Sequence, residues 1–146
     1  MKVNLDINSD YKGIELTIKA SQITDEITNL MKRISSTEKS TIVGYLDDEV
    51  YLLDDKEIIR IYANDKKVIA ETSNYEFILR TRLYEIEDKL DLARFVRISN
   101  SEIINLKSVK KLDLSFSGTI GIVLANNKTS YVSRRYVGKI KETLGI

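Results

Sequence analysis

Residues 94–109 read RFVRISNSEIINLKSV, in which three small polar residues separate two apolar runs. The alternation of apolar and basic side chains over residues 95–98 is typical of a β-strand. Ser99, Asn100 and Ser101 end this pattern, and a polar turn that caps a following helix is their ordinary role. An asparagine amide can also bond an adenine edge through two hydrogen bonds, so the triplet raises the question of a nucleic-acid partner.

The chain on both sides of this stretch is a series of short segments with strand periodicity, separated by turn residues. Helical spacing predicts two short helices here, one over residues 83–90 and one after Ser133, which we expect to act as its N-cap. Many short strands with few helices predict a mainly β fold of the α+β class. The expected strands are residues 42–46, 50–53, 58–63, 67–72, 75–80, 95–98, 109–116, 119–125 and 129–132.

Residues 1–38 are predicted to form a separate ββα extension, with the main domain at residues 39–146. Two segments that alternate apolar and polar residues, 1–7 and 14–18, flank a turn at residues 8–10. A helix follows with an apolar face, and Thr24 is placed to cap it. Such a face is ordinarily part of a core, and a two-stranded hairpin is marginal alone, so the extension should pack on the domain or on a partner. The apolar face of the helix comprises Ile23, Ile27, Leu30, Met31 and Ile34, and the polar linker after it is Ser35-Ser36-Thr37.

Composition disfavours enzymatic chemistry. The chain has no Cys and no His, which excludes disulfides, Cys/His zinc sites and a Ser-His-Asp triad. We therefore expect no enzyme and no cofactor. The acidic cluster Asp47 to Asp55 leaves open a cation site or a carboxylate-based enzyme, although a turn with solvated charges is the more common explanation. Without an N-terminal apolar stretch or a run of about 18 apolar residues, the chain is expected in the cytoplasm.

Charge is distributed unevenly along the chain. Residues 92–146 carry ten basic and three acidic side chains, a net charge of +7, and since the whole chain carries +1, residues 1–91 carry −6. Such a split indicates an anionic partner for the C-terminal part. Arg134 and Arg135 stand at the start of the last predicted helix, where their charge opposes the helix dipole. Residues placed at that cost are candidates for a function.

Together these residues resemble the LytTR DNA-binding domain of bacterial transcription regulators. Its pattern matches the stretch 94–109, the later stretch SYVSRRYVGKIKETL at residues 130–144, and the strands, turns and helix of residues 57–90. The resemblance covers roughly residues 40–146. The matching positions are Phe95, Arg97, Ser101, Ile104, Asn105, Leu106, Ser133, Arg134, Arg135 and Tyr136.

The resemblance implies an elongated arrangement of small β-sheets with short helices that binds double-stranded DNA sequence-specifically. Loops and the start of the last helix, rather than a recognition helix, would read the bases. It assigns base contacts to Asn100 and Arg135, while Asn105 would hold a turn in place. The other expected DNA-binding residues are Lys66 or Lys67 in the first contact loop, Ser101 in the polar loop, Arg134 beside Arg135, and Arg97, Lys107, Lys110 and Lys128 at phosphates.

The resemblance also implies the partners. The chain is similar to stand-alone regulators of the family, which lack the phosphoacceptor domain of response regulators and are held in check by a membrane protein encoded nearby. We expect a homodimer on direct-repeat promoter sites, no small-molecule substrate, and an N-terminal extension that serves dimerisation or that restraint. The alternative function is a protein-interaction module that binds a membrane partner and no DNA.

Overall fold

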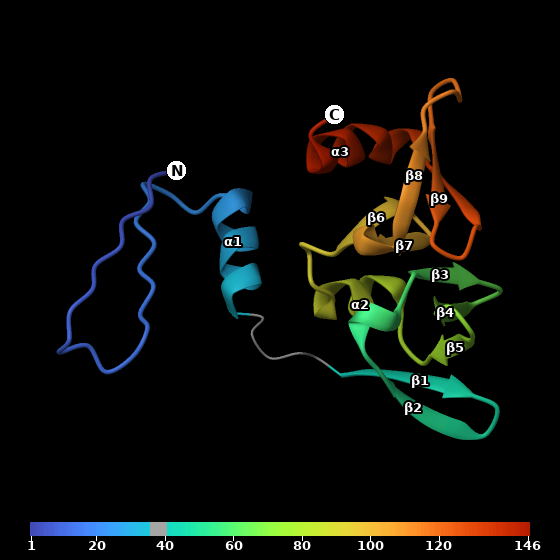
Figure 1. Cartoon of the computed structure of the whole chain (residues 1–146), viewed down its shortest axis with the longest axis horizontal. Coiled ribbons are helices and arrows are strands. Elements are labelled where there is room, and N and C mark those ends of the chain that lie inside the picture. Colours follow the sequence, from blue (N-terminus) through green and yellow to red (C-terminus); the bar gives the residue numbers. More distant parts are fainter. Residues whose placement is uncertain (36–40) are drawn as a thin grey trace.

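The computed structural model describes residues 1–35 and 41–146, and its C-terminal part contains two antiparallel sheets (Figure 1). The larger sheet has seven strands in the order β2-β1-β5-β4-β3-β7-β6, and the smaller one has three in the order β10-β9-β8. The mainly β fold predicted from the sequence is therefore confirmed. The strands are β1 (Ile42–Leu46), β2 (Glu49–Leu53), β3 (Arg60–Asn64), β4 (Lys67–Glu71), β5 (Glu76–Leu79), β6 (Phe95–Ser99), β7 (Glu102–Asn105), β8 (Val109–Asp113), β9 (Ile120–Leu124) and β10 (Thr129–Val132).

Three α-helices accompany the sheets in the described part of the chain: α1 (Asp25–Ser35), α2 (Leu83–Lys89) and α3 (Arg134–Leu144). α2 lies against β3, and α3 packs on β6. Two short 3-10 helices, η1 (Asp55–Glu57) and η2 (Leu106–Ser108), connect strands.

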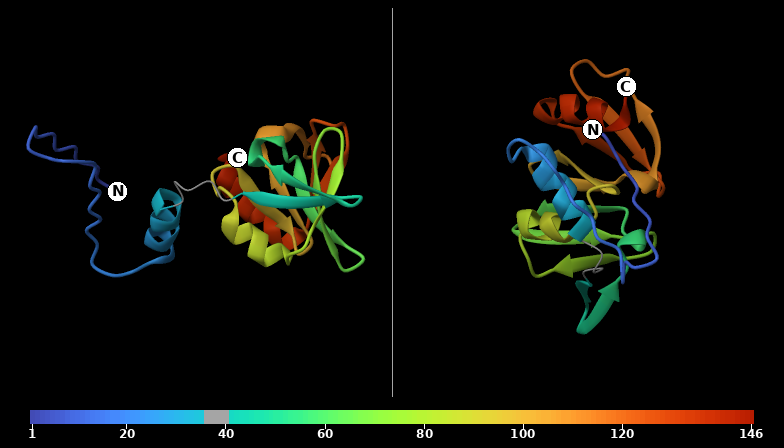
Figure 2. Two further views of the ribbon diagram at one scale, coloured as in Figure 1. Left: turned by 90° about the horizontal axis from the view of Figure 1, so that it is seen from below. Right: turned by 90° about the vertical axis from the view of Figure 1, so that its left-hand side faces the viewer.

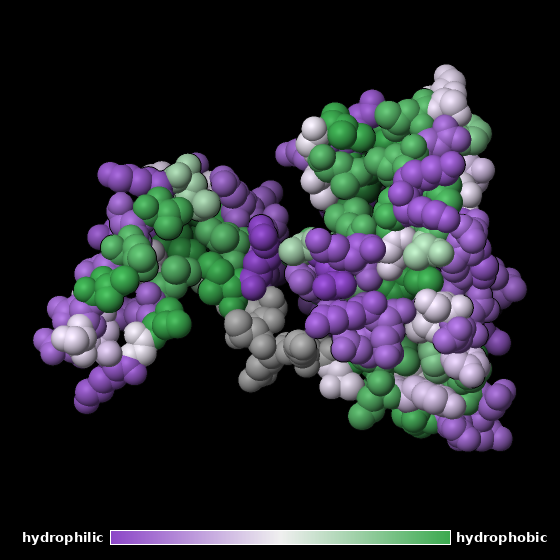
Figure 3. Space-filling model, viewed as in Figure 1, coloured by the Kyte–Doolittle hydropathy of each residue, from purple (hydrophilic) through white to green (hydrophobic). Residues whose placement is uncertain are grey.

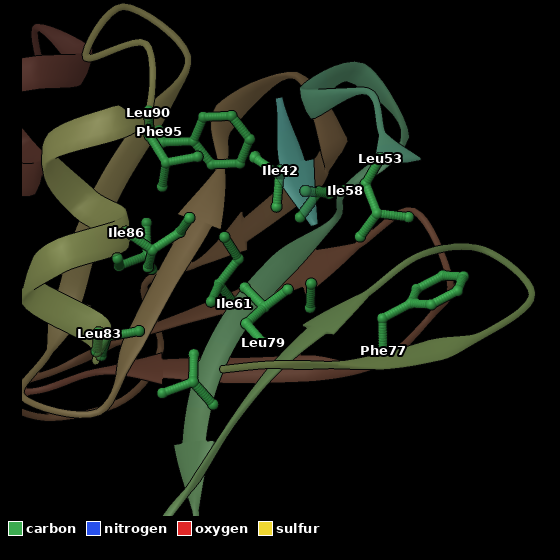
Figure 4. Packing of buried hydrophobic residues seen from close by; sticks show 13 residues of the cluster. Ile42, Leu53, Ile58, Ile61, Phe77, Leu79, Leu83, Ile86, Leu90 and Phe95 are labelled. Atoms are coloured by element: carbon green, nitrogen blue, oxygen red, sulfur yellow. The ribbon is translucent and has the colours of Figure 1, made fainter. Parts of the chain in front are cut away.

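The strands β6 and β7 are buried on both faces, and the neighbouring β3 contributes Ile61 to one of the two cores. Phe95 and Ile103 belong to a core shared with α2 and the β4–β5 hairpin, which Figure 4 shows from close by. Their chain neighbours Val96 and Ile104 belong to a second core, beneath the three-stranded sheet and α3. Successive side chains of a strand point to opposite faces, so adjacent apolar residues supply both cores. Because of this continuous apolar pattern, the sequence did not predict β7, and the triplet Ser99-Asn100-Ser101 joins two strands rather than capping a helix.

A polar network joins the two sheets at the edge of the second core. Arg60 on β3 donates to buried Glu71 on β4 at 2.6 Å and to Glu102 on β7 at 3.1 Å. It also donates to Ser130 on β10, whose hydroxyl lies 2.6 Å from Glu102. Lys128, in the β9–β10 turn, pairs with Glu71 at 2.7 Å. The small sheet is thus anchored to the large one by hydrogen bonds to charged groups, which are stronger than neutral ones.

Residues 1–24 differ from the sequence-based expectation. The helix is confirmed as α1, with the Ile27 amide donating to the Thr24 hydroxyl at 3.3 Å, and the turn at Asn8 is closed by the Tyr11 amide. The two predicted strands are wrong for the single chain, because residues 1–7 and 14–18 run exposed without strand pairing. An isolated hairpin with no surface to cover its apolar face is not stable in water. The predicted linker and the boundary at residue 38 include positions outside the described residues.

The charge network predicts an acid-sensitive stability. Burial alone would raise the pKa of Glu71, but hydrogen bonds from Lys128 and Arg60 outweigh it and hold that pKa below its ordinary value. A carboxylate with a depressed native pKa stabilises the fold above its unfolded-state pKa, and this stabilisation is lost as pH falls through the native pKa. At neutral pH, Glu71→Gln should lower the free energy of unfolding. The loss should be somewhat less than the roughly 3–5 kcal/mol typical of breaking a fully buried ion pair, because Lys128 is half exposed.

The measurement is urea unfolding at neutral pH and at about pH 3. The difference between wild type and Glu71→Gln should shrink at the lower pH. Glu76→Gln is the matched control, since Glu76 lies 3.9 Å from the same Lys128 but is half exposed. A Glu71→Gln deficit that stayed constant over this pH range would show that the ionised carboxylate is not the stabilising species.

Candidate nucleic-acid interface

Two turns lie side by side at one end of the larger sheet. The β3–β4 turn is a two-residue hairpin between paired Asn64 and Lys67, in which Asp65 and Lys66 have positive φ values of 48° and 62°. Positive φ at both central residues defines a type I′ turn, which matches the twist of paired strands. Since β3 pairs antiparallel with β7, the β6–β7 turn reaches the same end, and the Ala63 amide donates to the Ser101 carbonyl at 2.8 Å.

Arg97 fixes the shape of the β6–β7 turn from within. Its guanidinium donates to the carbonyl oxygens of Ser99, at 2.8 Å, and Asn100. Its third nitrogen pairs with Glu87 on α2 at 3.1 Å, and only 16% of its side chain is exposed. The Ser101 amide closes the turn by donating to the Ser99 hydroxyl at 3.2 Å. The structure therefore gives Arg97 a positioning role, and its expected contact with phosphate stays a prediction.

The start of α3 is bonded to the same turn. The Ser133 amide donates to the Ile98 carbonyl at 2.9 Å, and the Tyr136 hydroxyl donates to the side-chain oxygen of exposed Asn100 at 3.2 Å. The exposed Arg135 guanidinium lies 5.5 Å from the centroid of the Tyr136 ring, within range of a cation–π contact. Asn100 and Arg135, separated by a long stretch of sequence, are therefore held on one side of the molecule through Tyr136.

We call this surface the loop edge, defined as residues 64–67, 99–101 and 133–136. Lys66, Lys67, Arg134 and Arg135 are exposed on it against one exposed acidic residue, Asp65, so its net charge is +3. The Tyr136 bond also orients the Asn100 amide, because it leaves the nitrogen donors and one oxygen lone pair directed elsewhere. Such an edge offers what a duplex requires: cations for phosphates and a donor–acceptor pair for a base edge.

Ser133 departs in one respect from the sequence-based expectation. It occupies the N-cap position of α3, but its side chain makes no capping hydrogen bond. Its hydroxyl is buried without a partner among the described residues. The first turn of α3 is therefore held by the bond from the Ser133 amide to β6 rather than by the predicted side-chain cap.

Lys107 and Lys110 lie at the other end of β7. Lys107 is in η2, and Lys110 donates to Asn127 in the β9–β10 turn at 3.0 Å. The Ala125 amide ties this turn to η2 through the Ser108 carbonyl at 2.8 Å. A four-residue strand with its flanks spans roughly 15 Å, so these lysines form a second basic group, distinct from the loop edge. The structure thus places most of the expected contact residues in two groups, whereas Lys128 is paired with buried Glu71.

Two other sequence-based interpretations can be compared with the structure. Asn105 is fully buried and holds the chain, because it donates to the Ile58 carbonyl at 2.8 Å and accepts from the Lys107 amide at 3.0 Å, as predicted. Asp47 and Asp48 form the β1–β2 turn, and Asp54 accepts from the Lys56 amide. Within residues 1–35 and 41–146, no acidic group is arranged to hold a metal ion.

Sequence reasoning did not assign roles to Tyr136 and Glu87. Tyr136 was recognised as a family position, but its bond to Asn100 spans 36 residues, and no local periodicity indicates it. Glu87 is on α2, where spacing predicted only the apolar face, and its partner Arg97 was expected at DNA. Both contacts are tertiary, so they become visible only in the fold.

Comparison with known proteins agrees with the fold. A model of the LytTr DNA-binding domain matches residues 48–145. Two relatives, from Staphylococcus aureus strains NCTC 8325 / PS 47 and COL, each bear the name uncharacterized HTH-type transcriptional regulator. Each is 38% identical over 147 residues, which cover 100% of this chain and 99% of the relative. The solved LytTr DNA-binding domain of a Bacillus cereus protein superposes with a TM-score of 0.71 and 22% identity, over 74% of this chain and 99% of that one.

A β-rich domain with this family match and these relatives is a DNA-binding domain of a transcription regulator. The chain belongs to the LytTR family. Although the relatives are named HTH-type, strands separate α1 from α2 and α2 from α3 in this chain, so the described helices form no helix-turn-helix pair. None of the helices described is long and apolar enough to span a bilayer.

The bracing of the β6–β7 turn generates a prediction. Arg97→Lys keeps the charge near Glu87 but cannot reach two carbonyls and a carboxylate with one ammonium group. We expect a loss of about 1–2 kcal/mol in unfolding free energy, and higher backbone mobility of residues 99–101 in NMR relaxation. Arg135→Lys, at the exposed guanidinium on the same edge, is the control and should leave the turn as ordered as in wild type. Equal mobility in both variants would contradict the positioning role of Arg97.

Proposed function

We propose that the loop edge binds double-stranded DNA sequence-specifically and so regulates transcription without catalysis. The observation that carries the proposal is the Asn100–Tyr136 hydrogen bond, which holds the two expected base-reading residues together on one exposed, positive edge. Family membership supports the DNA partner. The contacts within the edge support rigid loops, so little ordering entropy would be lost on binding.

In this proposal, some residues of the loop edge contact bases and others contact phosphates. Asn100 and Arg135 read base edges, because amide and guanidinium groups can make paired hydrogen bonds to adenine and guanine. Lys66, Lys67 and Arg134 contact phosphates, which supply most of the affinity and make it dependent on salt. Ser101 and Arg97 hold the polar turn in the geometry that presents Asn100.

We propose that the second basic group, Lys107 and Lys110, also contacts the duplex. Lys107 and Lys110 lie roughly 15 Å along β7 from the loop edge, a spacing comparable with half a turn of a duplex whose full turn is about 34 Å. We assign to them phosphate contacts that carry no sequence information. Two such chains on direct-repeat sites would bind as a homodimer with increased avidity. The membrane-protein inhibitor expected from the sequence stays a prediction.

Base reading by Arg135 can be tested after a binding site has been selected from a random duplex pool with the full chain. Arg135→Ala should weaken binding to the selected site by about 1–3 kcal/mol, or roughly 5- to 150-fold, and binding to scrambled DNA much less. Lys141→Ala removes a charge from the last turn of the same helix and should change both affinities little. Fluorescence anisotropy at fixed salt gives the measurement. Equal losses on selected and scrambled DNA for Arg135→Ala would remove its role as a base reader.

Lys110→Ala should act differently. A phosphate contact has no sequence preference. The variant should therefore weaken binding to selected and scrambled DNA by the same factor, and should reduce the slope of log affinity against log salt concentration by about 1. Affinities measured at several salt concentrations check this. If the full chain enriched no sequence and bound no duplex at low salt, the alternative of a protein-interaction module without DNA binding would be favoured.

A further inference from the structure

The N-terminal arm, residues 1–35, exposes an unusually large amount of apolar surface. These side chains were predicted to share one face of two strands. In the structure they are exposed to water, for example Leu5 at 84% and Leu16 at 61% exposure. Figure 3 shows apolar side chains exposed together on this part of the molecule, as they also are on parts of the domain, and Figure 2 shows the arm standing away from the sheets. Monomeric proteins rarely leave such a patch exposed unless it binds something.

The turn in the arm already sets a register for a hairpin. The Tyr11 amide donates to the Asn8 carbonyl at 3.1 Å, so Asn8 lies opposite Tyr11. Counting outward from this pair places Leu5 opposite Ile14 and Val3 opposite Leu16. Directly opposite residues of an antiparallel pair share a face, so the apolar residues of both segments gather on one side. These residues are Val3, Leu5, Ile7, Ile14, Leu16 and Ile18.

α1 presents its apolar side away from its own domain. Its basic last turn, Lys32 and Arg33, lines a cavity of about 850 Å³ opposite Glu87 and Asp88 of α2. The apolar side carries exposed Met31 and Ile34 and does not face this cavity. An isolated helix of 11 residues is marginal in water, as is an isolated hairpin, so each gains stability only from a common partner surface.

The surface area indicates how large that partner interface is. The accessible surface of the chain is 11045 Å². A compact monomer of 16.7 kDa is expected to expose about 7,600 Å², so the excess is roughly 3,400 Å². Obligate homodimers bury about 2,000–5,000 Å² in total, which this excess can supply from two chains with area to spare.

The charge of the arm favours a second copy as the occupant. Residues 1–35 contain five basic and five acidic side chains, so two arms do not repel one another. An anionic membrane surface would instead attract a basic segment. Two hairpins with one apolar face each, and two helices with one apolar face each, can cover one another around a two-fold axis.

We propose that the N-terminal arm is a homodimerisation element that folds when two copies meet. Residues 1–7 and 14–18 of each chain then pair as a hairpin, and the apolar faces of the hairpins and α1 helices form a shared core. The two LytTR domains are thereby joined on one side while both loop edges stay free. The increased avidity on paired DNA sites rests on the proposed function, whereas the self-association does not.

Sedimentation equilibrium of the full chain tests the proposal. Wild type should sediment as a dimer at micromolar concentration, and Leu5→Glu/Leu16→Glu should raise the dimer dissociation constant at least 100-fold, since it places four charges in the shared core. The matched control, Asn4→Glu/Thr17→Glu, adds the same charges to the opposite face of the same hairpin and should remain dimeric. A wild-type chain that stays monomeric at 100 μM, or equal dissociation constants for the two double variants, would overturn the proposal.

Hydrogen exchange locates the interface independently of any variant. Amides of residues 3–7 and 14–18 should be protected at concentrations where the chain is dimeric and unprotected on dilution. A dimer whose arm amides exchange at the unprotected rate would place the interface elsewhere and refute the inference. Binding of Leu5→Glu/Leu16→Glu to a single selected DNA site separates the two proposals: retained binding there leaves the proposed function intact even if self-association fails.

Discussion

The structure depends on the burial of β6 and β7 on both faces. Side chains that alternate along these strands fill two cores, so each strand is fixed in register and rotation at once. A slip of one residue would exchange the contents of the cores and bring Arg60 or Arg97 into apolar surroundings. Both arginines interrupt the apolar pattern, and each forms an ion pair with a carboxylate, Arg60 with Glu71 and Arg97 with Glu87.

This constraint positions the loop edge. Fixed strands have fixed ends, and the antiparallel pairing of β3 with β7 brings their turns together. The second core then places α3 against β6, so that the Ser133 amide reaches Ile98 and Tyr136 reaches Asn100. The residues proposed to contact DNA are thus supported by a core, although they lie on turns. This arrangement agrees with the general observation that binding residues lie on loops held by a rigid scaffold.

The sequence predicted the fold class, most strands and both helices of the domain, because these follow from local periodicity and turn chemistry. The structural role of Asn105 came from the family resemblance. It failed at β7, where double-sided burial removes the alternation of Glu102–Asn105 that identifies a strand. It also failed at residues 1–18. Their alternation of apolar and polar residues is that of a strand, but in the described part of the single chain these segments form no strand pairs and their apolar side chains are exposed. The positive charge of Arg97 suggested a contact with DNA, and only the tertiary contacts show that its guanidinium braces a turn.

The start of α3 explains why stability and binding favour different residues at the loop edge. Arg134 and Arg135 oppose the positive end of the helix dipole, each at a cost of about 0.3–1 kcal/mol, and the Ser133 side chain supplies no cap to offset it. The helix tolerates this cost because Ile140 is fully buried in the second core and the Ser133 amide is bonded to β6. The two guanidinium groups and the helix end therefore add their positive potentials at one point of the surface. A phosphate or a guanine edge placed there would relieve the repulsion, so the same charges that destabilise the free protein would favour its complex with DNA.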